Sequence, residues 1–141
     1  TFDMNNNDRP TQAQKDRYYE IIKWAAQRGL GLTMHWNRDA SSGELLALFE
    51  RLNSEIPIAG LRWSVAHLND ASEKTLQRMK ALGMGWTVQD AMYFGGEQFQ
   101  QQNGVEAARR IPPVDTAKRV GVPVGAGTGA PRVAAFHPVS A

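Results

Sequence analysis

Two histidines stand at equivalent points of two similar stretches of the chain. His35 closes the apolar run in "GLTMHWNRDASSGELL" (31–46), and His67 closes the run in "LRWSVAHLNDASEKTL" (61–76). If these runs are neighbouring parallel strands, which lie about 5 Å apart, their terminal imidazoles can converge on one ion. We therefore predict His35 and His67 as ligands of zinc or another divalent transition metal. A structural, hydrogen-bonded role is the alternative for each.

Other polar residues follow the later apolar runs. Gln89 and Asp90 end one run, and Thr128 ends another. Active sites of parallel α/β proteins lie at the carboxyl ends of the strands. We predict Asp90 as a catalytic carboxylate, with a loop cap as the alternative, and Gln89 and Thr128 as substrate-binding residues.

The remaining candidates have simpler interpretations. Asp39 and Asp70 lie in strand-to-helix turns, where short acidic side chains accept hydrogen bonds from free backbone N–H groups, so both are predicted as caps. His137 is expected at the surface. The glycine-rich "GAGTGA" lacks the Lys-Ser/Thr of a phosphate-binding loop. Aromatic residues next to strands usually fill core space, and this is the role predicted for Trp36, Trp63 and Trp86.

Hydrophobic periodicity predicts the elements that position these residues. Strands are expected over 30–34, 61–66 and 122–126 as continuous apolar runs, and over "MGWTVQD". The first helix is expected over 12–29, with apolar residues Tyr18, Ile21, Ile22 and Ala25. A second helix is expected to begin with a capping box of Ser41 and Glu44, and its apolar stripe is Leu45, Leu48, Phe49 and Leu52. A third has Leu76, Met79 and Leu82 facing inward. Residues 95–110 read as a long, partly helical loop, and a short helix follows Pro112-Pro113.

The alternation of short strands and helices predicts an α/β fold with a parallel sheet. Four such units make half of a TIM-type (β/α)8 barrel, here a single partial-barrel domain over 1–141 with a flexible start (1–11) and an irregular tail (130–141). A small open sheet is the alternative. Half a barrel leaves one apolar sheet face and two edges uncovered, which predicts self-association or a missing N-terminal half.

The composition is that of an ordinary globular protein. The 141 residues are 42% hydrophobic and 21% charged, with a net charge of +2 and no cysteine. Scattered basic residues do not form a nucleic-acid groove, and the apolar runs are too short to span a bilayer. We expect a cytoplasmic protein with neither nucleic-acid nor membrane partners.

Several segments together resemble the second half of amidohydrolase-superfamily enzymes, of the metal-dependent subgroup similar to N-substituted formamide deformylase. They are "LTMHWNRDAS", "VAHLND", "GMGWTVQD" and "RRIPPVDTAKRVGVPVGAGTGAPR". The resemblance covers most of residues 16–136. It implies that His35 and His67 match the metal ligands of barrel strands five and six, and that small amide-like substrates are hydrolysed at a C–N bond.

The chain also departs from that family pattern. Gly129 stands where the aspartate of barrel strand eight is expected, and glycine can neither ligate a metal nor accept a proton. The ligands of the earlier barrel strands would precede Thr1. The resemblance thus implies a fragment or divergent member with weak or no activity as this chain. The alternative is a non-catalytic interaction or assembly module that retains the barrel fold.

Overall fold

The computed structural model describes residues 9–89 and 94–127, which form a four-stranded parallel sheet with helices. The strands are β1 (Thr33–Trp36), β2 (Ser64–His67), β3 (Gly85–Gln89) and β4 (Val124–Gly127), and they pair in sequential order. This confirms the predicted α/β fold built from parallel βα units. The order of neighbours is that of a barrel segment and gives no support to an unrelated open sheet.

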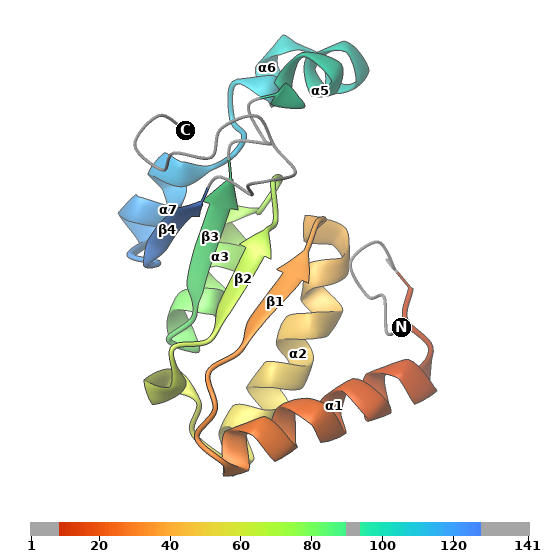
Figure 1. Cartoon of the computed structure of the whole chain (residues 1–141). Coiled ribbons are helices and arrows are strands. Elements are labelled where there is room, and N and C mark those ends of the chain that lie inside the picture. The colour runs from red at the N-terminus through yellow and green to blue at the C-terminus, as the bar shows by residue number, and fades with distance from the viewer. Residues whose placement is uncertain (1–8, 90–93, 128–141) are drawn as a thin grey trace.

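Two details of the predicted strands are wrong. β1, β2 and β4 begin two or three residues later than the expected runs 30–34, 61–66 and 122–126. Burial along β1 alternates, with Thr33 and His35 exposed and Met34 and Trp36 buried. Alternation results because successive strand side chains point to opposite faces, and only one face of this sheet packs against helices (Figure 1).

The first helix, α1 (Gln12–Gln27), begins with a capping box that was not predicted. Thr11 Oγ1 accepts a hydrogen bond from the backbone N–H of Gln14 at 3.2 Å, and Gln14 Oε1 accepts one from the Thr11 N–H at 2.9 Å. The prediction is confirmed for Ile22 and Ala25, which are buried, and wrong for Ile21, which is 41% exposed. Tyr19 and Ala26 are buried as well, whereas Tyr18 is only partly buried.

Helices α2 (Asp39–Glu55), α3 (Glu73–Ala81) and α7 (Val114–Val120) pack in succession behind the sheet. The predicted capping box of Ser41 and Glu44 is wrong. The N-cap is Arg38, three residues before Ser41, and the buried Ser41 hydroxyl donates to the Arg38 carbonyl at 3.1 Å. A 3-10 turn, η1 (Ala59–Leu61), precedes β2.

Residues 95–110 are more helical than predicted. They form all of α5 (Gly96–Asn103) and all of α6 (Val105–Ala108). Gly104, at φ +85°, separates the two helices. Figure 1 shows this pair beyond the arrowheads of the strands, on the carboxyl edge of the sheet.

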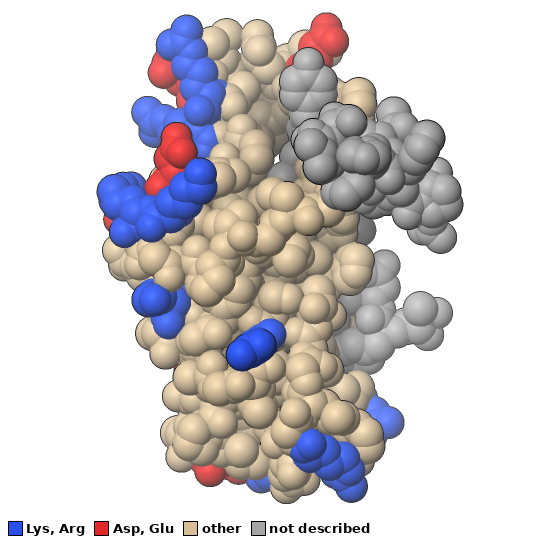
Figure 2. Space-filling model, turned by 60° about the vertical axis from the view of Figure 1, so that its left-hand side comes forward, with Lys and Arg blue, Asp and Glu red and all other residues tan. Residues whose placement is uncertain are grey.

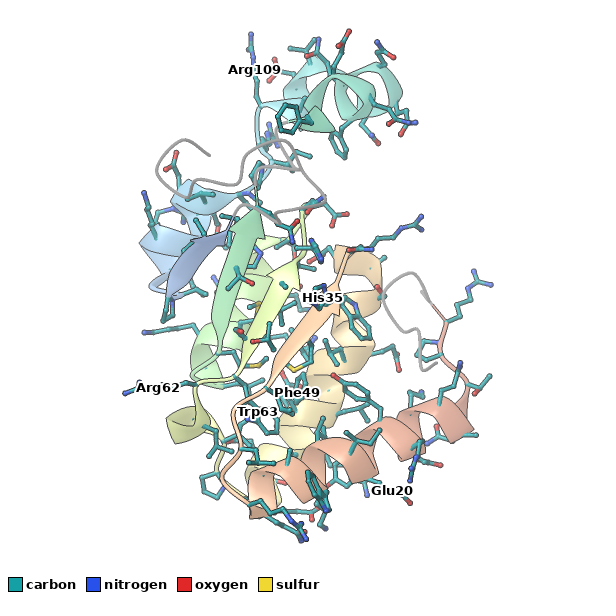
Figure 3. All side chains as sticks on the ribbon, in the orientation of Figure 1. Glu20, His35, Phe49, Arg62, Trp63 and Arg109 are labelled. Carbon is teal, nitrogen blue, oxygen red and sulfur yellow. The ribbon has the colours of Figure 1, made fainter. Side chains whose placement is uncertain are left out.

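The core lies between the sheet and the helices behind it. Trp36, Trp63 and Trp86 are each at most 1% exposed, as predicted. The ring of Phe49 meets that of Trp63 edge to face, with centroids 5.5 Å apart (Figure 3). Three large aromatic side chains on or beside the strands therefore fix the sheet against α2 and α3.

The other face of the sheet is small and polar, not apolar as expected. Thr33, His35, Thr87 and Gln89 occupy the alternate positions on β1 and β3. The Thr33 and Ser64 hydroxyls are hydrogen-bonded across β1 and β2 at 2.9 Å. Figure 2, which brings the β4 side forward, shows a broad surface with few charged groups. This face thus offers polar groups to a ligand or a partner.

No helix in the described part of the chain is both long and apolar enough to cross a membrane. The predicted irregular tail (130–141) and most of the flexible start (1–11) lie outside the described residues.

Candidate metal site

The structure brings the two predicted histidines into direct contact. His35 Nδ1 and His67 Nε2 are 2.8 Å apart, and the ring centroids are separated by 4.9 Å. Figure 3 places His35 near the carboxyl end of β1. His35 is exposed and His67 is half-buried. One ring nitrogen of each residue is therefore aimed at the same point on the carboxyl edge of the sheet, where solutes can reach it.

The backbone of His67 is what makes this contact possible. In the sheet register His67 pairs with Trp36, whose side chain faces the helices, while His35 pairs with Ala66. Simple alternation would therefore direct His67 away from His35. Instead His67 has φ +75° and Leu68 has φ +45°. This left-handed backbone turns the strand end, so that the imidazole reaches the face on which His35 lies.

Left-handed backbone is costly for residues other than glycine, so neighbouring contacts must stabilise it. The Leu68 N–H donates to the Trp36 carbonyl at 2.6 Å, and the indole N–H of Trp86 donates to the His67 carbonyl at 2.7 Å. The Leu68 side chain is 1% exposed. Both the C=O and the N–H of the His67–Leu68 peptide group are thus hydrogen-bonded to Trp36 and Trp86, two buried residues of the sheet.

The environment of His67 favours its neutral form. Burial, and then the nearby charge of His35, lower the pKa of His67 below its ordinary value. Only a neutral imidazole offers a nitrogen lone pair to a metal. In the hydrogen bond seen here one ring nitrogen donates and the other accepts, whereas metal binding would direct both lone pairs at the ion.

The donor geometry fits a metal only in part. Two nitrogens bound tetrahedrally to one zinc at about 2.0–2.1 Å are about 3.3 Å apart, so the rings would separate by about 0.5 Å. Small side-chain rotations achieve this at an exposed edge. Within residues 9–89 and 94–127, however, no group of three or more His, Cys, Asp or Glu side chains could hold a metal. The described residues therefore offer two imidazole nitrogens, fewer than the three protein ligands of an ordinary catalytic zinc site.

The two predicted capping aspartates join the loops that follow β1 and β2. Asp39 Oδ1 accepts from the Ser72 N–H at 2.8 Å, and Asp70 Oδ1 accepts from the Asp39 N–H at 2.9 Å. Each carboxylate thus satisfies a free N–H at or just before the start of a helix, and in both cases it belongs to the other loop. This clamp fixes the relative position of the two strand ends that carry the histidines.

The structure places only one of the other predicted site residues. Gln89 ends β3 on the same face as His35, and it is half-buried. Asp90, Thr128, Gly129 and His137 lie outside the described residues, so their roles stay predictions.

Sequence reasoning missed the contribution of α5 and α6. Phe94 and Val105 line a pocket beside Gln89, together with Arg109. The only signal in the sequence was isolated apolar residues in a Gln-rich segment, which gave no clear helical period. The left-handed turn at His67 had no signal either, since glycine or asparagine usually marks one.

No curated protein and no solved structure matches this chain. The profile of the Amidohydrolase family matches residues 2–141, which include both histidines, the clamp and all four strands. This chain belongs to the Amidohydrolase family.

Proposed function

We propose that this chain forms part of a metal-dependent hydrolase that cleaves C–N bonds of small amides, in the subgroup similar to N-substituted formamide deformylase. Members of the Amidohydrolase family usually bind divalent metals. The observation that carries the proposal is the contact of 2.8 Å between His35 Nδ1 and His67 Nε2 at the carboxyl edge of a parallel sheet. Zinc is the metal we propose, because neutral imidazole is one of its common ligands.

The residues of this chain have distinct roles in the proposal. His35 and His67 would hold the metal, which when bound supplies Lewis acidity and lowers the pKa of a coordinated water. Gln89 would orient the substrate, since its amide can both donate and accept a hydrogen bond. Asp90 is proposed as the acceptor of a proton and Thr128 as a second substrate contact, both on the basis of sequence position.

The site needs further ligands, and we propose that a complementary half supplies them. β1 and β4 are the two edges of the four-stranded sheet in the described residues. A closed barrel would pair both edges and would surround the open face that carries His35 and Gln89. A second copy of this chain or an N-terminal half could complete it. Light scattering that shows a compact monomer at micromolar concentration would exclude the second copy.

Metal binding by the purified chain tests the site directly. We expect calorimetry to detect one zinc ion per histidine pair, and both His35→Ala and His67→Ala to abolish that binding. His137→Ala is the matched control, because it removes the third histidine of the chain and should leave the binding intact. Equal zinc uptake by all four proteins would refute the assignment.

The competing function is a non-catalytic interaction module, which the Gly129 substitution favours. The two functions differ in their response to Gly129→Asp. If the remaining ligands come from a partner, restoring the carboxylate should raise hydrolysis of a simple N-acyl amide above that of the unmodified chain. If the chemistry has been lost, Gly129→Asp should leave the chain inactive.

A further inference from the structure

The carbonyl group of His67 lies where the regular pairing of two strands stops. The last residues of β2 and β3 that pair in register are Ala66 and Thr87, so the pairing ends one residue before His67. In a longer parallel ladder a backbone N–H of the neighbouring strand would bond the next carbonyl group. The His67 carbonyl instead accepts a hydrogen bond from the indole N–H of Trp86 at 2.7 Å. A side chain thus takes the place of a backbone donor at one of the two histidines.

The indole donor of Trp86 is itself held in a fixed position. The Trp86 side chain is fully buried, and side chains of a close-packed core occupy defined rotamers. The backbone N–H of Trp86 donates to the Pro123 carbonyl at 2.8 Å, and Trp86 pairs with Val65 in the sheet register. Both the backbone and the ring of this residue are therefore fixed, so the indole N–H can hold the end of β2 in one place.

The three core tryptophans show that burial alone does not produce such a bond. The buried indole N–H of Trp36 has no hydrogen-bond partner in the part of the chain that the structure describes. The indole N–H of Trp63 donates to the Leu30 carbonyl at 2.8 Å. Trp63 and Leu30 precede β2 and β1, so this bond lies at the amino ends of the strands, whereas His35 lies near the carboxyl ends (Figure 3). Of these three indoles, that of Trp86 is the one that bonds a residue of the histidine pair.

The peptide group between His67 and Leu68 is held from both neighbouring strands. Its N–H donates to the Trp36 carbonyl on β1, and its C=O accepts from the Trp86 indole on β3. The residues on either side have φ +75° and +45°, which is costly for residues other than glycine. Without the indole bond, the peptide group is held from β1 alone, and the backbone can relax toward an extended conformation. An extended His67 directs its imidazole away from His35.

We propose that Trp86 is a positioning residue of the histidine pair, whose indole N–H holds the His67 carbonyl so that the His67 imidazole faces His35. The orientation of the rings depends only on the contacts of this structure, whereas its consequence for metal binding rests on the proposed function. Residues that orient metal ligands from outside typically contribute about 10- to 100-fold to metal affinity. Trp86 lies on β3, which carries neither histidine. A third strand therefore controls the geometry of a site whose two ligands come from β1 and β2.

Replacing Trp86 with benzothienylalanine tests the proposal, because sulfur takes the place of the indole N–H while the ring keeps nearly the same shape. Trp86→Phe is a second variant without the donor. We expect both variants to lose the nuclear Overhauser contact between the ring protons of His35 and His67 in the metal-free chain. In calorimetry, both should bind zinc more weakly by about tenfold or more. The same two replacements at Trp63 are the matched controls, because they remove an equivalent indole bond at the amino ends of the strands. They should retain both the ring contact and the zinc affinity.

Urea unfolding separates positioning from a general loss of stability, since replacements at Trp63 and Trp86 each remove one buried indole bond. The proposal is overturned if both Trp86 variants keep the ring contact or the zinc affinity of the unmodified chain. It is equally overturned if the Trp63 variants lose the ring contact to the same extent, or if the unmodified chain shows no such contact. If the unmodified chain shows the contact but binds no zinc, the proposed function fails, and the ring contact alone decides whether Trp86 positions His67.

Discussion

The left-handed backbone at His67 leads to an unusual prediction about glycine. At an ordinary strand position such as His35, replacement by Gly should give a less stable protein than replacement by Ala, by ~0.5–1 kcal/mol, since glycine loses more chain entropy on folding. His67 has φ +75°. There alanine retains the steric cost of the left-handed region, roughly 1–2 kcal/mol, whereas glycine does not.

The expected magnitude follows from these two opposing terms. Relief of the steric cost outweighs the entropy loss of glycine, about 0.4–1 kcal/mol. His67→Gly should therefore be more stable than His67→Ala by roughly 0.5–1 kcal/mol, while His35→Gly is less stable than His35→Ala. All four variants lose the contact between the two imidazoles, so this loss cancels within each pair.

Urea unfolding with chelator present, followed by fluorescence of the buried tryptophans, measures these differences. In thermal unfolding 1 kcal/mol corresponds to a midpoint shift of ~3–4 °C for a domain of this size. The decisive quantity is the sign of the Gly-minus-Ala difference at each position. The same negative sign and size at both positions would refute the strained turn, and with it our explanation of how His67 reaches His35.

Three further predictions concern the surroundings of the histidine pair. Leu68→Ala should reduce the free energy of unfolding by about 2–5 kcal/mol in urea titrations, because the side chain is 1% exposed and its loss leaves a cavity; a smaller loss than Leu48→Ala, at a partly buried position, would contradict the burial. Asp39→Ala should cost about 1 kcal/mol in the same assay through the lost bond to the Ser72 N–H, and Asp115→Ala, with an exposed side chain on α7, serves as control. The pKa of His67 is lowered from 6.5, so the unfolded chain binds more protons below that pH and the metal-free protein should lose stability as the pH falls from about 6.5 toward the lowered pKa. His67→Ala should show a shallower loss over that window, and an identical pH profile would contradict the shift.

The general fold could be predicted because it depends on patterns that extend over many residues. Apolar runs that alternate with helical stripes repeat through the chain, and a parallel sheet is the usual arrangement of such units. The predictions were wrong where the burial or the capping role of a single residue had to be chosen among similar neighbours. Ile21 and Ile22 are adjacent and equally apolar, yet Ile22 is 1% exposed and Ile21 is 41% exposed, so packing, and not residue type, determines which of them is buried. The start of α2 has several residues that could act as N-cap. Arg38 takes this place through its extended backbone and forms no capping hydrogen bond with its side chain.

Contact between the two histidines depends on information that residue spacing does not contain. Equivalent positions at two strand ends predicted proximity, but the register places His67 opposite Trp36, on the wrong face for His35. Its reorientation requires two successive residues at positive φ, a conformation that histidine adopts only occasionally and that leucine disfavours. That turn is stabilised by the indole N–H of Trp86, from a third strand. Because the stabilising bond joins residues 19 positions apart, the orientation of His67 is a property of the folded sheet. A change in the Trp86 contact should therefore disturb the site without altering either histidine.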